Sequence, residues 1–120
     1  TDKEYPADKT IQQLFEEQVE KMPDSIALVF EDQQLTYREL NKRANQLAHY
    51  IRDRYKANFN ESLPPDTLIA LCIERGLEMV IAMLAILKAG AAYVPLEPNY
   101  PYDRLRCILL DTNAKIILTN

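Results

Sequence analysis

The chain has 120 residues, of which 48% are hydrophobic and 27% are charged, and its formal net charge is −4. These values are typical of one ordinary globular domain, and the negative charge argues against nucleic-acid binding, which needs Lys and Arg to neutralise phosphates. The longest apolar run, Met79–Leu87, is far below the roughly 20 residues of a membrane span. The densest basic cluster is interleaved with apolar residues and predicts a solvated helix face; it consists of Lys42, Arg43, Arg52 and Arg54.

The first expected elements are a helix and a β-hairpin. Thr10 and Gln13 have the spacing of a capping box, and apolar residues at helical spacing follow them: Ile11, Leu14, Phe15, Val19 and Met22. Two short β-prone runs come next, Ile26–Phe30 and Leu35–Tyr37. The four polar residues between them predict the loop of a hairpin.

A second helix is expected from about Tyr37. Its apolar residues recur every three or four positions, which is typical of an amphipathic helix; they are Leu40, Ala44, Leu47, Ala48, Ile51 and Tyr55. His49 lies beside this stripe without a second His or a Cys at ligand spacing, so we interpret it as structural. The polar stretch Lys56–Asp66 contains Pro64 and Pro65 and predicts a loop.

The second half of the chain alternates strands and helices. We expect strands over Leu68–Ile73, Ala92–Leu96 and 114–120, and helices over Leu77–Lys88 and from about Pro101, the last presenting Tyr102, Leu105, Ile108 and Leu109. Strand-helix-strand alternation implies right-handed crossovers and a parallel sheet covered by helices. The fold class is therefore α/β. The helix over 77–88 is apolar nearly all round, so we expect Leu84 and Leu87 to be largely buried. Gly90 is a suitable residue for the end of this helix, where a left-handed conformation is needed.

Residues that would form a reaction centre are scarce. Cys72 and Cys107 lie in apolar stretches without metal-site spacing, which predicts reduced, buried thiols in a cytoplasmic protein. A phosphate-binding loop needs several glycines, whereas the chain contains only Gly76 and Gly90. We therefore assign no catalytic, cofactor-binding or metal-ligating residue.

Two motifs nevertheless resemble a known family. The chain resembles the N-terminal portion of amino-acid adenylation domains of nonribosomal peptide synthetases, in the AMP-forming ligase superfamily. "LTYREL" (Leu35–Leu40) matches the first core motif of that family, and "LKAGAAYVPLE" (Leu87–Glu97) matches the second, with Ala91 where glycine is commoner and Glu97 where aspartate is commoner. "PNYPYDRL" (Pro98–Leu105) continues in the same manner.

The resemblance divides the chain into a linker-like segment, residues 1–9, and an N-terminal fragment of an adenylation domain, residues 10–120. "YPAD" (Tyr5–Asp8) looks like the linker from a preceding condensation domain, and the Lys56–Asp66 loop is longer than is usual in the family. The resemblance implies that the parent enzyme uses Mg-ATP to form an aminoacyl adenylate and passes the aminoacyl group to a carrier protein. Its phosphate loop, amino-acid pocket and catalytic lysine lie further along the family's sequence, so the fragment is expected to be inactive alone.

Two other hypotheses stay open from the sequence. One is a stand-alone interaction module derived from such a domain, and the other is a fragment of an acyl-CoA ligase-like enzyme. If the chain is a fragment, its apolar strands have an edge or a face left uncovered, so we expect it to self-associate. A strictly monomeric chain would instead favour the stand-alone module.

Overall fold

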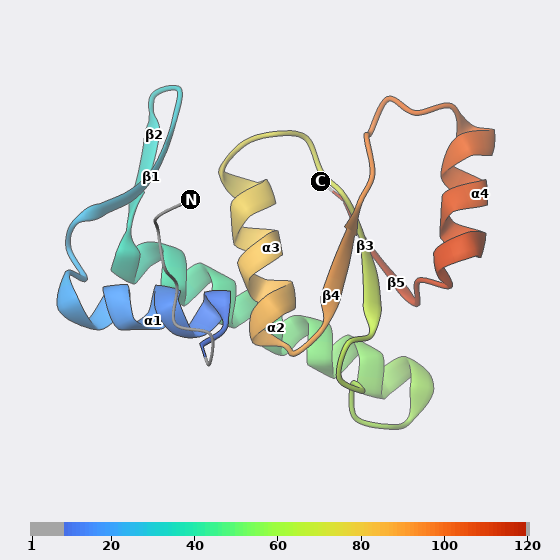
Figure 1. Ribbon diagram of the computed structural model, residues 1–120, viewed down its shortest axis with the longest axis horizontal. Helices are drawn as coiled ribbons and strands as arrows, with labels where there is room; N and C mark the ends of the chain where they lie inside the picture. The colour runs from blue at the N-terminus through green and yellow to red at the C-terminus, as the bar shows by residue number, and fades with distance from the viewer. Residues whose placement is uncertain (1–8, 120) are drawn as a thin grey trace.

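The computed structural model describes residues 9–119. The linker-like stretch Tyr5–Asp8 therefore lies outside the described residues. Along the described chain the elements are ordered α1, β1, β2, α2, β3, α3, β4, α4 and β5. They form a helix and hairpin followed by a parallel sheet with helices, which is the predicted α/β fold (Figure 1).

Helix α1 covers Ile11–Lys21 and begins with the predicted capping box. The Gln13 amide donates to Thr10 Oγ1 at 3.2 Å, and the Thr10 amide donates to Gln13 Oε1 at 2.8 Å. The predicted apolar face is only partly covered: Phe15 is half-buried and packs against the core, whereas Ile11 is 66% exposed.

Strands β1 (Ile26–Phe30) and β2 (Gln33–Thr36) pair antiparallel. The predicted four-residue loop is wrong, because Phe30 pairs with Gln33 and leaves only Glu31 and Asp32 in the turn. Glu31 has a φ of 56°, the positive value that tight hairpin turns require. The glutamines after it belong to β2 with exposed side chains, so their polarity marks a solvent-facing strand and not a loop.

Helix α2 covers Tyr37–Phe59 and is capped by a second box formed by Thr36 and Glu39. The predicted stripe is confirmed: five of its members are buried, namely Leu40, Ala44, Ala48, Ile51 and Tyr55. The first four residues of the predicted loop, 56–59, belong to the helix. The Phe59 ring packs on the Tyr55 ring at a centroid distance of 4.5 Å, and Asn60 ends the helix with a φ of 57°.

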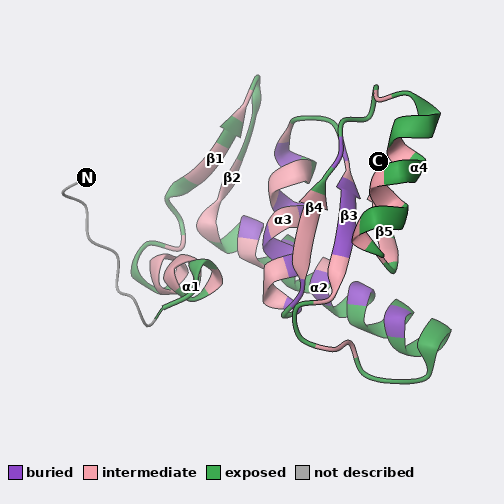
Figure 2. Cartoon of the chain, turned by 45° about the vertical axis from the view of Figure 1, so that its right-hand side comes forward, coloured by how far each residue is buried: buried purple, intermediate pink, exposed green. Residues whose placement is uncertain are grey.

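The second sheet contains β3 (Leu68–Cys72), β4 (Ala92–Pro95) and β5 (Ile116–Thr119) in the order β4-β3-β5, all parallel. Helix α3 (Leu77–Lys88) lies on one face and α4 (Tyr102–Thr112) on the other (Figure 1). The central residues of β3 are buried, whereas α4 has no buried residue. Figure 2 shows this difference between an interior β3 and a largely exposed α4.

Helix α3 contributes to two hydrophobic clusters, which explains why it is apolar nearly all round. In the first cluster Ala82, Ala85 and Ile86 meet the sheet and α2. In the second cluster Ile81 and Leu84 meet the N-terminal half of α2, with α1 and the hairpin packed around them. Leu84 is buried at 9% exposure, as predicted, whereas Leu87 is only half-buried.

The predicted burial of both cysteines is wrong. Cys107 is exposed on α4, and Cys72 is half-buried at the end of β3. Cys107 lies among apolar residues in the sequence, but the half-buried side of α4 is formed by its neighbours Leu105, Ile108 and Leu109. An apolar context therefore did not indicate which side of this helix faces the protein.

Truncating Leu84 should destabilise the whole chain. We expect Leu84→Ala to lower the free energy of unfolding by about 2–5 kcal/mol, because buried contacts are lost and a cavity remains. Urea denaturation followed by circular dichroism measures this. The matched control is Leu110→Ala on α4, where the side chain is 68% exposed and the expected loss is below about 0.5 kcal/mol. Equal midpoints for Leu84→Ala and the parent chain would contradict the packing of α3.

Apolar side chains on the α4 side of the sheet should drive self-association of the isolated chain. Tyr102 is 77% exposed, Leu110 68% and Ile117 48%, and such surfaces favour contacts between copies. Light scattering across a concentration series should show an apparent mass that rises with concentration. Leu110→Glu should reduce that rise, and a monomer at all concentrations would refute the prediction.

Candidate functional site

The C-terminal end of α3, inside the second family-like motif, is closed by a Schellman motif. The Gly90 amide donates to the Leu87 carbonyl at 3.0 Å, and the Ala91 amide donates to the Ile86 carbonyl at 3.1 Å. Gly90 has a φ of 83°, a conformation that glycine adopts at least cost. A Cβ at this position would meet nothing within 4 Å, so the need for glycine is one of backbone conformation and not of space.

Two neighbouring helices supply donors to this helix end. Gln12 Nε2 of α1 donates to the Leu87 carbonyl at 3.1 Å, and Arg52 Nη2 of α2 donates to the Lys88 carbonyl at 2.9 Å. Carbonyls in the last turn of a helix have no partner within the helix. These side chains therefore satisfy them and hold α1 and α2 against α3.

Lys88 is the charged residue of this helix end. Its side chain is only 5% exposed, and its Nζ lies 2.6 Å from Glu16 Oε2 and 5.7 Å from the centroid of the Phe15 ring. A buried ammonium needs such a carboxylate partner. The lysine of the motif is thus part of the contact between α1 and α3.

The end of the motif and the residues that follow it form the connection from β4 to α4. The Leu96 amide donates to the Leu71 carbonyl at 2.9 Å, and the Tyr100 amide donates to the Glu97 carbonyl at 3.1 Å to form a turn. The Arg104 guanidinium then stacks 4.8 Å from the centroid of the Tyr100 ring. These contacts fix the connection between the last two strands.

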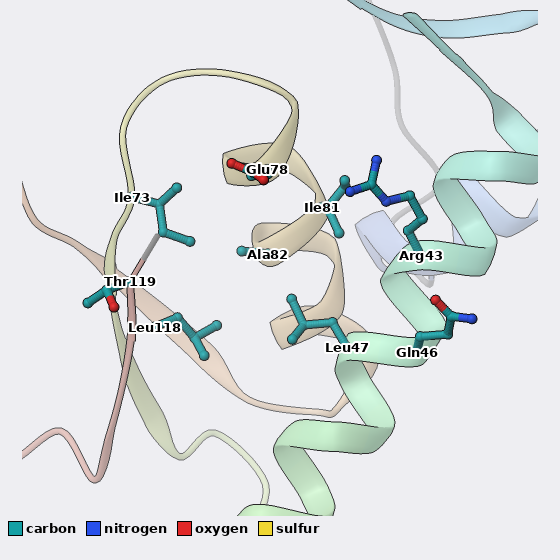
Figure 3. Close-up of a pocket in the computed structure, with 9 residues that line it drawn as sticks. All are labelled: Arg43, Gln46, Leu47, Ile73, Glu78, Ile81, Ala82, Leu118 and Thr119. Carbon is teal, nitrogen blue, oxygen red and sulfur yellow. The ribbon is translucent and has the colours of Figure 1, made fainter.

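A cavity of about 450 Å³ opens beyond the C-terminal ends of β3 and β5. In open α/β sheets this is the end where ligands bind, at the point where the strand order reverses. Figure 3 shows Leu47 of α2 and Leu118 of β5 pointing toward each other across it. The lining is mostly aliphatic, with Arg43 and Glu78 as its charged groups; it comprises Arg43, Gln46, Leu47, Ile73, Glu78, Ile81, Ala82, Leu118 and Thr119.

The residues beside this cavity carry charges of both signs. The loop from β3 to the N-terminus of α3, where a phosphate would meet backbone amides, contains the single glycine Gly76. Glu74 and Arg75 lie in that loop, Glu78 lies in the first turn of the helix, and Arg43 of α2 lines the cavity as well. That the chain itself holds no phosphate stays a prediction of the family resemblance.

Other candidate groups stay apart from one another. Within residues 9–119, no group of three His, Cys, Asp or Glu side chains could hold a metal ion. His49 is exposed on α2.

The basic residues of α2 are exposed as predicted, but Arg52 also reaches the end of α3 and Arg43 lines the cavity. Sequence periodicity did not reveal the cavity, because β5 and α2 meet there from distant parts of the chain.

Among residues 9–119, no helix is both long enough and apolar enough to cross a bilayer.

Comparison with known proteins agrees with this architecture. The family model of AMP-binding enzymes matches residues 15–120. Tyrocidine synthase 2 of Brevibacillus parabrevis is 51% identical over 120 residues, and bacitracin synthase 2 of Bacillus licheniformis is 49% identical over 113 residues. The chain spans only 3% and 4% of those two proteins.

Solved structures show the same fold. The N-terminal subdomain of NpsA from Klebsiella oxytoca superimposes with a TM-score of 0.80 at 31% identity, over 92% of this chain and 27% of that subdomain. The nonribosomal peptide synthetase FmoA3 superimposes with a TM-score of 0.85 at 31% identity, over 98% of this chain and 12% of its own. The chain therefore belongs to the AMP-binding enzyme family, as a fragment of the N-terminal subdomain of a nonribosomal peptide synthetase adenylation domain.

Proposed function

We propose that this chain is the structural beginning of an enzyme that activates an amino acid. In the proposed reaction the amino-acid carboxylate attacks ATP, which gives an aminoacyl adenylate and releases pyrophosphate. The phosphopantetheine thiol of a carrier protein then attacks the acyl carbon of the adenylate, which forms a thioester and releases AMP. The observation that carries the proposal is the match of about half of all positions, along the whole chain, to peptide synthetases.

The proposed contribution of the chain is to support the parent domain without touching the substrate. Its two family-like motifs start α2 and close the end of α3, and both have structural contacts. In the proposal Mg-ATP is held by the remainder of the parent, since the chain contains only two glycines and no glycine-rich phosphate loop. The chain alone is then a scaffold without a reaction centre.

The proposed partners are the remainder of the adenylation domain, a carrier protein and a condensation domain, in the cytoplasm. One structural relative is an artificially fused adenylation and peptidyl carrier protein di-domain, which supports the carrier protein as a neighbour. The net charge of −4 supports a partner set without nucleic acid.

The isolated chain should not exchange pyrophosphate into ATP. We expect no amino-acid-dependent incorporation of labelled pyrophosphate above the level without enzyme, for any of the standard amino acids, because the phosphate-holding loop is missing. Leu84→Glu is expected to unfold this chain, because it buries an unpaired carboxylate. Exchange that disappears in this variant would refute the proposal.

A chimera provides the positive control. The region of the NpsA N-terminal subdomain that matches this chain is replaced by residues 10–120, and binding of anthranilyl-AMSN is measured, since that subdomain is known in complex with this compound. Binding by the chimera supports the scaffold role. A folded chimera that does not bind the compound would contradict it.

A further inference from the structure

One side of α2 carries a straight row of basic and polar residues. Successive members are alternately four and three positions apart, so the row stays on one side of the helix over a length of about 27 Å. We call it the basic row, and all of its members are exposed: Arg38, Lys42, Asn45, His49, Arg52 and Lys56. Figure 2 shows exposed segments between the buried ones along α2. The row is therefore accessible to another molecule.

The cations of the basic row form two matching pairs. Arg38 and Lys42 are four residues apart. Arg52 and Lys56 repeat this spacing two heptads further along the helix, a distance of about 21 Å. Asp53 borders the second pair, but α2 as a whole has six Lys and Arg side chains against two carboxylates. Since the whole chain has a net charge of −4, α2 is a cationic helix in an acidic chain.

Contacts within the structure leave most of this charge available. Arg38 Nη2 lies 3.2 Å from Asp24 Oδ1, but the two side chains are 64% and 82% exposed, and such surface pairs contribute little. Arg52 donates one N–H to a carbonyl at the end of α3 and has further donors to offer. Lys42 and Lys56 have no ion-pair partner in the described part of the chain. An incoming carboxylate would thus meet cations that are not yet neutralised.

The spacing of the row indicates a helix as its occupant. Two helices that lie side by side meet along positions spaced four and three apart, and carboxylates at such positions pair with Lys and Arg. Along α2, successive members of the row are about 4.5 and 6 Å apart. An extended segment instead presents a side chain to one face every 6.6 Å or so, about twice its rise per residue. A helical partner therefore matches the row better than a strand.

The charges and the lack of apolar side chains in the row exclude other classes of occupant. Membrane-bound helices need an apolar face for insertion, and the row has none. Nucleic acid is disfavoured by the net charge of −4, which opposes a polyanion. A further layer of the same subdomain would have to bury four cations, at a large desolvation cost. A partner that docks reversibly at the surface avoids that cost.

We propose that the basic row binds an acidic α-helix of a separate protein. In the complex, two pairs of carboxylates on the partner helix, two heptads apart, face the two pairs of cations. Asn45 and His49 lie between the pairs and contact the middle of the partner helix. The inference goes beyond the proposed function and does not depend on it, since it concerns a surface of α2 that has no part in the amino-acid activation.

The test uses a designed helix as the probe. The probe is an alanine-based peptide of about 22 residues, long enough to form a helix in water, with glutamates in two i, i+4 pairs two heptads apart. A control peptide has the same composition, with the glutamates distributed around the helix. In an NMR titration of the chain, the probe should shift the amide signals of Lys42, His49 and Lys56. The control peptide should bind more weakly by about fivefold or more.

Charge reversals on α2 provide matched variants of the chain. Lys42→Glu and Lys56→Glu should each weaken binding of the probe by about tenfold. Arg54→Glu lies on the opposite side of the same helix, beside β5, and should change binding by less than about twofold. Circular dichroism checks that each variant keeps the helix content of the parent chain.

Four outcomes would overturn the proposal. The first is no shift of these signals at about 1 mM probe, and the second is equal binding of the probe and the control peptide. The third is tighter binding of a uridine oligonucleotide or of phosphatidylserine vesicles at the same signals, which would assign the row to a nucleic acid or a membrane. The fourth is a shift of these signals when the chain alone is concentrated, which would assign the row to a second copy.

Discussion

The fold depends on a helix that has to be covered on nearly every side. Helix α3 is apolar around most of its circumference, so leaving any face in water would be unfavourable. Its residues enter two separate clusters, one with the sheet and one beside α1 and the hairpin. The N-terminal half and the parallel sheet are therefore joined through α3 together with α2, which also has buried residues in both clusters.

Such a helix needs a firmly fixed end. Gly90 turns the chain, while Gln12 and Arg52 bind the last carbonyls and Lys88 pairs with Glu16. Gln12 and Glu16 link this end to α1 and Arg52 links it to α2, so the turn also sets where α1 and α2 lie. This gives a structural reason for the family-like run of lysine, alanine and glycine at the end of the helix.

Features governed by local chemistry could be predicted from the sequence. The capping box at Thr10, the bounds of α3 and the stop at Gly90 depend on residues within one or two turns, and all three are present. The α/β order follows from alternation, which is also local. No site residue was predicted, and the basic residues of α2 could only be interpreted as a solvated face.

The features that were missed depend on tertiary contacts or on exposure. The polar β2 residues pair with β1, and α2 continues because Phe59 packs on Tyr55. Cys107 lies in an apolar run but on the exposed side of a loosely packed helix. The cavity lies between α2 and β5, which are more than fifty positions apart in sequence, so no motif or periodicity could reveal it.

The claim that α3 unites the two halves is tested most directly by unfolding them together. In a urea titration followed residue by residue by NMR, Leu28 reports on the hairpin and Ala70 on the central strand. If α3 couples both clusters, the two native amide signals should disappear at the same urea concentration, as in a two-state transition. Loss of the Leu28 signal at a concentration lower by about 1 M or more, with Ala70 still native, would show that the halves are independent and would contradict the account.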